Sequence, residues 1–114
     1  MPTRYYIRLP DGAAARGGDA STSFSAHGAE GFAEQLGEAV RTSKVFDRWC
    51  SAQHDPDDVD PSLGATDPNA TVTGAQQDLH IDLVLTTTLP GEVVRHRLRL
   101  LAGSNWQLRD VTAA

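Results

Sequence analysis

The spacing of hydrophobic residues changes along the chain, and each change predicts a different element. In residues 4–9 (RYYIRL), Tyr5, Ile7 and Leu9 alternate with Tyr6 and an arginine. Alternation with a period of two is typical of a strand with one buried face. We therefore predict a half-buried strand over this segment.

A helical period replaces this alternation near residue 29. Phe32, Leu36 and Val40 fall on one helix face. The opposite face carries glutamates at i, i+4 and i+8, namely Glu30, Glu34 and Glu38. We interpret this stripe as a solvated helix face. A second helical segment is expected over residues 42–53, because a hydroxyl side chain can cap it at either of the first two positions.

Two stretches lack a regular pattern and are expected to be long loops. Residues 10–28 are rich in glycine, alanine, serine and aspartate, and residues 54–70 contain prolines that prevent a helix. After the second loop, residues 70–76 predict a short strand that is interrupted at Gly74.

The last third of the chain shows alternation again. In residues 78–88, Leu79, Ile81, Leu83 and Leu85 alternate with Asp78, His80, Asp82, Val84 and Thr86. In residues 94–102, apolar residues alternate with Arg95, Arg97 and Arg99. We predict two strands joined by a turn at the Pro-Gly pair of residues 90–91.

The predicted hairpin has a self-consistent register. It pairs Leu83 with Leu98, Ile81 with Leu100 and Asp82 with Arg99, so that apolar residues and opposite charges meet. A loop over residues 103–105 would then lead to a last strand, with Trp106 and Leu108 on the buried face.

These elements predict an α+β fold in a single domain over residues 1–114. The N-terminal strand is followed by a helix with a helical extension, and then by a three- to four-stranded antiparallel meander packed on the helix. The order β-α-β-β-β is similar to that of cystatins. Their Gln-x-Val-x-Gly loop is matched in ATVTG by Val72 and Gly74 only, and no Pro-Trp wedge is present. The resemblance to cystatins is therefore one of topology.

The charge of the chain is concentrated in one segment. Residues 1–53 and residues 71–114 are each neutral, so the formal net charge of −5 comes from residues 54–70, which hold Asp55, Asp57, Asp58, Asp60 and Asp67. Such a layout disfavours nucleic acid as a partner. We interpret the segment as a solvated linker, with an irregular cation site or an acidic docking segment as alternatives.

Composition narrows the class of protein further. The single cysteine, Cys50, excludes an internal disulfide, and no apolar run is long enough to span a membrane. The segment before residue 10 lacks the apolar core of a signal peptide, so we expect a cytoplasmic protein. The excess of arginine over lysine suggests a GC-rich, bacterial gene.

No motif predicts a catalytic residue, a cofactor or a metal. The histidines, His27, His54, His80 and His96, lack the spacing of a zinc site. Glycine-rich phosphate loops, dinucleotide fingerprints and nucleophile elbows are absent from the sequence. Asp78 and Asp82 lie near His80, but an exposed sheet face gives them no pocket in which to act as an acid–base cluster.

The functional hypothesis rests on the arginines of the predicted sheet. The face away from the helix would carry Arg95, Arg97, Arg99, Arg109 and Tyr6. Its ordinary interpretation is a solvent face paired with aspartates. Our hypothesis is instead a non-catalytic protein-interaction module that binds an acidic protein partner, or less favourably RNA, through this face. An edge strand offers a route to a homo-oligomer.

A second hypothesis belongs to a different class. It is a small-ligand-binding protein or a small enzyme, with a pocket between helix and sheet lined by His96, Trp49 or Trp106. A cavity holding at least two ionisable side chains would favour this alternative.

Overall fold

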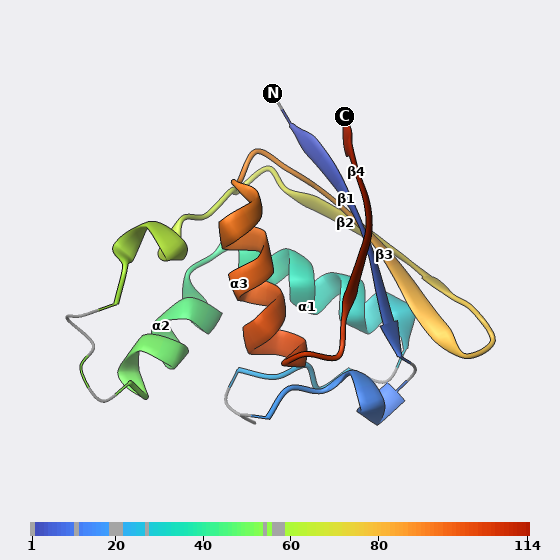
Figure 1. Cartoon of the computed structure of the whole chain (residues 1–114), viewed down its shortest axis with the longest axis horizontal. Helices are drawn as coiled ribbons and strands as arrows, with labels where there is room; N and C mark the ends of the chain where they lie inside the picture. Colours follow the sequence, from blue (N-terminus) through green and yellow to red (C-terminus); the bar gives the residue numbers. More distant parts are fainter. Residues whose placement is uncertain (1, 11, 19–21, 27, 54, 56–58) are drawn as a thin grey trace.

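The sheet is antiparallel throughout, and its strand order differs from the chain order. The structure is a computed structural model that describes residues 2–10, 12–18, 22–26, 28–53, 55 and 59–114. In this part of the chain the strands are β1 (Thr3–Pro10), β2 (Thr71–Gln76), β3 (His80–Thr87) and β4 (Gln107–Ala113). Figure 1 labels these strands along the chain. Their order in the sheet is β2-β3-β1-β4, so β2 and β4 form the two edges.

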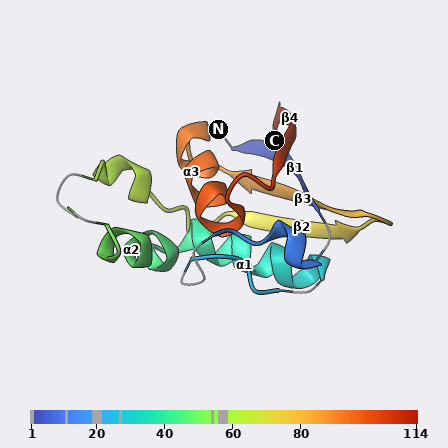
Figure 2. The same ribbon diagram turned by 60° about the horizontal axis from the view of Figure 1, so that its bottom comes forward.

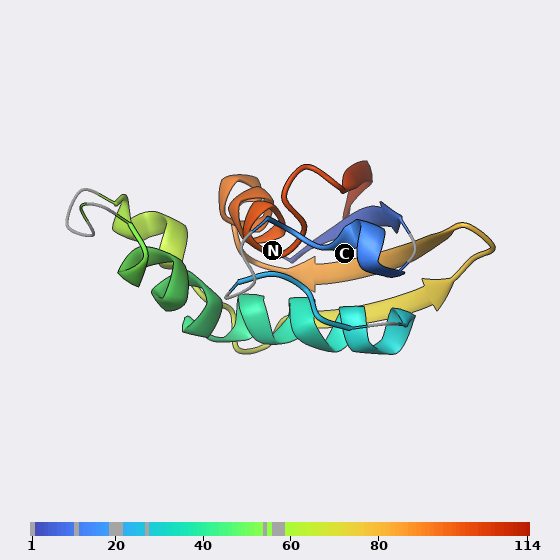
Figure 3. The same ribbon diagram turned by 90° about the horizontal axis from the view of Figure 1, so that it is seen from below.

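The helices are α1 (Ala29–Arg41), α2 (Lys44–Ser51) and α3 (Gly91–Ala102), with short 3-10 turns η1 (Gly12–Ala15) and η3 (Pro61–Gly64). α1 and α3 pack on one face of the sheet, whereas α2 packs against α1, α3 and η3. Buried residues of α1 and α3 share one core with the inward side chains of the two central strands. Figures 2 and 3 show α1 running beside β2.

The element order is β-α-α-β-β-α-β, which is the split β-α-β arrangement of ferredoxin-like folds with α2 added after α1. The connection through α1 joins β1 to β2 across the inserted β3, and the connection through α3 joins β3 to β4 across the inserted β1. The expected α+β class and antiparallel sheet are confirmed. The β-α-β-β-β order of the cystatin comparison does not hold, because α3 lies between β3 and β4.

The early elements follow the predicted pattern closely. On β1, Tyr5, Ile7 and Leu9 are buried, whereas the residues between them are partly exposed. On α1, Phe32 and Leu36 are fully buried, and the glutamate stripe is exposed. Local periodicity was sufficient to predict both elements.

The prediction of a strand over residues 94–102 is wrong, because these residues belong to α3. Val94, Leu98 and Leu101 are buried at i, i+4 and i+7, which is a helical spacing. The expected pairs of this segment with β3 therefore do not form. Instead, Leu83 of β3 pairs with Ile7 of β1.

Three details of the remaining strands also differ from expectation. Leu79 lies at the β2–β3 turn and is 84% exposed, so it does not share the buried face of β3. β2 continues through Gly74, which pairs with Leu83. β4 pairs with β1 rather than with residues 94–102, and Leu108 lies opposite Ile7.

The described parts of the two long connections are attached to the body. In the first, Phe24 is buried, its ring lies 4.8 Å from that of Phe32, and its amide donates to Leu101 O at 2.8 Å. In the second, η3 and the segment after it contact α1 and α3. Among the described residues, no helix is long and apolar enough to cross a membrane.

Candidate functional site

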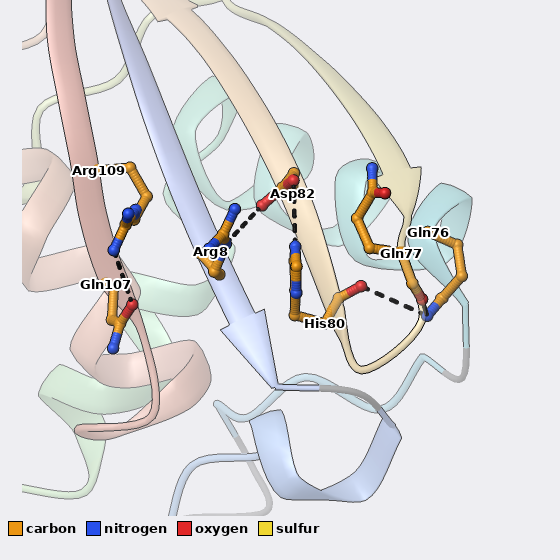
Figure 4. Close-up of polar contacts among 7 residues, drawn as sticks. All are labelled: Arg8, Gln76, Gln77, His80, Asp82, Gln107 and Arg109. Atoms are coloured by element: carbon orange, nitrogen blue, oxygen red, sulfur yellow. Dashed lines mark hydrogen bonds and ion pairs between the residues drawn. The ribbon is translucent and has the colours of Figure 1, made fainter.

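The candidate site is the sheet face opposite the helices, here called the open face. Alternation places Arg4, Tyr6 and Arg8 of β1 on it, because their neighbours on the strand are buried. The register adds residues of the flanking strands, which are Thr73 and Ala75 of β2, His80, Asp82, Val84 and Thr86 of β3, and Gln107, Asp110 and Thr112 of β4. Figure 4 shows Arg109 on this face beside Gln107.

A row of charged groups crosses the open face near the end of β1. Arg8 lies opposite Asp82 in the register, and its Nε donates to Asp82 Oδ1 at 3.0 Å (Figure 4). The other carboxylate oxygen of Asp82 lies 3.4 Å from His80 Nε2. These side chains are 29–36% exposed, so the Arg8–Asp82 ion pair contributes only about 0–1 kcal/mol. The row therefore adds little to the stability of the fold.

Most of the N–H donors of the Arg8 guanidinium are unused within the described part of the chain. In the described part of the chain, its two terminal guanidinium nitrogens donate to no residue. Arg109 Nη1 contacts Gln107 Oε1 at a long 3.5 Å. A guanidinium with unused parallel donors is suited to bidentate recognition of carboxylates.

A hollow lies at the end of the open face, beside this row. It has a volume of about 320 Å³ and is bounded by the end of β1, His80 and residues 104–107. Trp106 forms one wall, and its indole nitrogen donates to Gly103 O at 2.9 Å. Asn105 Nδ2 donates to Arg16 O at 3.1 Å. Both contacts fix the loop that carries the wall.

The predicted arginine face is divided between two elements. Arg109 and Tyr6 lie on the open face, as expected. Arg95 and Arg99 are exposed on α3, not on the sheet. Arg97 is fully buried, so it cannot contribute to a binding surface. Sequence reasoning placed α3 in the sheet, so it assigned Arg95, Arg97 and Arg99 to this face and did not single out Arg4, Arg8 and His80, which do lie on it.

Arg97 has a structural role that explains its burial. Its Nε donates to Ala39 O at 2.9 Å, one Nη donates to Leu63 O, and the other donates to Ala65 O at 2.8 Å. Its guanidinium carbon lies 5.2 Å from the centre of the Phe46 ring. Burial lowers the pKa of Arg97 from its ordinary value. Arginine nevertheless remains charged in proteins, so carbonyl dipoles and an aromatic ring must compensate this charge.

The residues predicted to line a pocket between helix and sheet do not all share one site. His96 packs against Trp49, with ring centres 4.5 Å apart, at the junction of α2 and α3. Trp106 instead belongs to the hollow at the end of the open face. The buried Nδ1 of His96 has no hydrogen-bond partner among the described residues, and burial lowers the pKa of this imidazole.

Cys50 has the character of an unreactive thiol. Burial and the nearby Asp47 carboxylate raise its pKa, which favours the protonated form. In the described residues, no group of three or more His, Cys, Asp or Glu side chains is arranged to hold a metal ion.

The acidic segment is partly built into the fold. Asp67 is buried, and its carboxylate accepts from the Thr87 hydroxyl at 2.8 Å and from the Thr88 amide at 3.0 Å. Asp60 caps η3 by accepting from Ser62 N at 3.0 Å. His54, Asp57 and Asp58 lie outside the described residues, as does His27. The linker interpretation therefore fails at the C-terminal end of the segment.

The chain was compared with protein-family models, with curated proteins and with solved structures, and none of the three comparisons found a match. Residue chemistry and geometry therefore carry the functional inference.

Proposed function

We propose that the chain is a non-catalytic protein-interaction module that binds an acidic protein surface through the open face of its sheet. The observation that carries this proposal is the one-sided packing of the fold. The helices bury one face of the sheet, whereas no described element covers the other. Antiparallel sheets commonly leave one face to solvent, so the chemistry of that face must supply the argument for binding.

The charge of the open face supports an acidic partner. It carries Arg4, Arg8 and Arg109 against Asp82 and Asp110, on a chain whose formal net charge is −5. This local excess of positive charge is opposite in sign to the rest of the molecule. Complementary potentials mainly increase association rates and specificity.

Tyr6 gives this surface an anchor. The register places it in the middle of the sheet, between Val84 of β3 and Asp110 of β4. Tyrosine and arginine are enriched among the residues that dominate binding energy in protein interfaces. An aromatic side chain with arginines on the same strand thus provides an anchor surrounded by charge.

A capture experiment with two matched variants tests the proposal. Arg4→Glu/Arg109→Glu reverses charge on the open face, and Arg95→Glu/Arg99→Glu makes the same change on α3. Tagged proteins would be incubated with a nuclease-treated cytoplasmic lysate of the source organism, which we infer to be a bacterium. We expect wild type and the α3 variant to retain one acidic partner that the open-face variant loses, and direct titration with that purified partner should repeat the difference. Equal capture by all three proteins, or capture that depends on RNA, would overturn the proposal.

The hollow at the end of the open face favours a second candidate function, the binding of a small carboxylate. It brings the free guanidinium donors of Arg8 and the His80 imidazole beside the ring of Trp106. Its volume of about 320 Å³ falls at the lower end of ligand pockets, which span roughly 300–1,000 Å³. Trp106 fluorescence in a Trp49→Phe background would report binding. Saturable quenching by benzoate but not by benzylamine, lost in Arg8→Met, would support this function over the interaction module.

A further inference from the structure

The two edges of the sheet differ in their protection against further strand pairing. β4 carries Arg109 and Asp110, and its register with β1 shifts at an irregularity opposite Tyr6 and Ile7. Charges and bulges are devices that block pairing at an edge. β2 has the sequence TVTGAQ, without a charge or a proline, and its register with β3 shows no shift. Of the two edges, β2 is therefore the one open to another strand.

The β2–β3 turn identifies the backbone groups at this edge. The amide of Gln77 donates to His80 O at 2.8 Å, so residues 77 and 80 form a hydrogen-bonded pair. Hydrogen-bonded and non-hydrogen-bonded pairs alternate along antiparallel strands. In the observed register, Val72 and Gly74 fall in non-hydrogen-bonded pairs with β3. Their N–H and C=O groups therefore point outward, where no described strand lies.

α1 forms a wall beside this edge. A Cβ atom on Gly74 would lie only 2.6 Å from Ala29 O, so the helix approaches β2 closely at that point. At the other end, Arg41 Nη1 donates to Ala70 O at 3.1 Å. An open hollow of about 470 Å³ lies between residues 28–31 of α1 and the end of β2, with Glu30 on its wall. An added strand would thus have α1 along one of its faces.

The charged side chains of this wall indicate the kind of segment that would bind beside β2. Glu30 lines this hollow and Glu34 follows one turn later on α1, and neither has an ion pair among the described residues, whereas Glu38 pairs with Lys44 at 3.4 Å. The cation of the wall, Arg41, lies at its other end and is occupied with Ala70 O. We propose that β2 accepts an extended segment of a protein partner, with Lys or Arg at the alternate positions that face α1. Main-chain hydrogen bonds would provide affinity and the two glutamates would provide specificity.

Two synthetic peptides and four protein variants, one of them the open-face variant described above, test this inference. The peptides are acetyl-Thr-Lys-Val-Lys-Val-Lys-Thr-amide and the same sequence with Glu in place of Lys. Val72→Pro removes an outward N–H that the β2–β3 ladder does not use, and proline is tolerated at such an edge position. Glu30→Lys/Glu34→Lys reverses the wall, and Glu92→Lys in the exposed first turn of α3 is the control.

We expect the basic peptide to bind wild type and the control saturably, with amide NMR shifts concentrated on residues 71–76. Both Val72→Pro and the double glutamate variant should weaken binding at least tenfold, while thermal melting verifies that each variant is folded. The open-face variant Arg4→Glu/Arg109→Glu should bind the peptide normally, which separates this site from the proposed function. Unchanged binding to Val72→Pro, absence of binding to wild type, or a wild-type dimer that Val72→Pro dissociates would overturn the inference.

Discussion

The buried guanidinium of Arg97 leads to the sharpest prediction about stability. It donates to the carbonyls of Ala39, Leu63 and Ala65. The first of these lies in the last turn of α1, and the other two lie in and just after η3. Carbonyls at a helix C-terminus lack partners within the helix and carry partial negative charge. Arg97 therefore caps α1 and η3 together and attaches the end of the acidic segment to the core.

The expected effect of Arg97→Met follows from what happens to each carbonyl. Hydrogen bonds to charged groups contribute about 1.5–3 kcal/mol each, but desolvation of the buried guanidinium offsets several kcal/mol of their sum. Ala65 is exposed and Leu63 is partly exposed, so water can replace the lost donor at both. Ala39 is fully buried, so its carbonyl would remain unsatisfied. The unsatisfied carbonyl and the release of η3 should together lower the free energy of unfolding by about 2–4 kcal/mol.

Urea denaturation followed by circular dichroism would measure this loss, with Arg99→Met as the control on the exposed side of α3. The control should stay within about 0.5 kcal/mol of wild type. Limited proteolysis should also cut Arg97→Met faster near residues 60–66 than it cuts the control. If Arg97→Met were as stable as Arg99→Met, Arg97 would not be the cap described here.

Three further predictions concern other buried contacts. Asp67→Ala should lower stability by about 1.5–3 kcal/mol, because it removes a charged acceptor. Hydrogen bonds lower the pKa of Asp67 below its ordinary 3.8. The stability that the Asp67 carboxylate contributes is therefore present above pH 3.8 and is lost as the pH falls through the folded-state pKa. In an acid titration of stability, Asp67→Asn should lack this loss. Burial lowers the pKa of His96 below 6.5, so the free energy of unfolding should fall as the pH drops below 6.5. Unfolding curves measured at several pH values should show this decrease, and His96→Phe should reduce it. Gly74→Ala should destabilise by about 1–3 kcal/mol in thermal melts because its Cβ meets Ala29 O, whereas Gly18→Ala, with nothing within 4 Å, should not.

Elements with a local signal could be predicted from the sequence. Tyr5, Ile7 and Leu9 fix the face of β1, because a period of two assigns each side chain to one side of a strand. The placement of Tyr6 on the open face follows directly. Strand partners are a non-local property, and the pairing of β1 with β3 and β4 has no signal in any short window. The position of Asp110 beside Tyr6 was missed for this reason.

The error at α3 had a different cause. In residues 93–102, Val94 and Leu98 satisfy both a period of two and a helical period. Boundary signals distinguish the two interpretations. Glu92 lies in the first turn, Arg99 lies in the last, and Gly103 follows with a φ of 62°, all of which are typical of a helix. Leucine and arginine, which fill this segment, are also good helix formers.

The helical conformation of α3 also determines which of its arginines are exposed and which is buried. In a strand, arginines at 95, 97 and 99 would be equivalent charges on one face. In a helix, Arg95 and Arg99 are neighbours at i and i+4, whereas Arg97 points to the opposite side. The exposed pair and the buried cap in the structure match this division. Charge reversal at all three positions would therefore unfold the protein through Arg97 and report nothing about a binding surface. Variants of Arg4 and Arg109 reverse charge on the open face and leave the cap intact, so a loss of binding in them can be assigned to the surface.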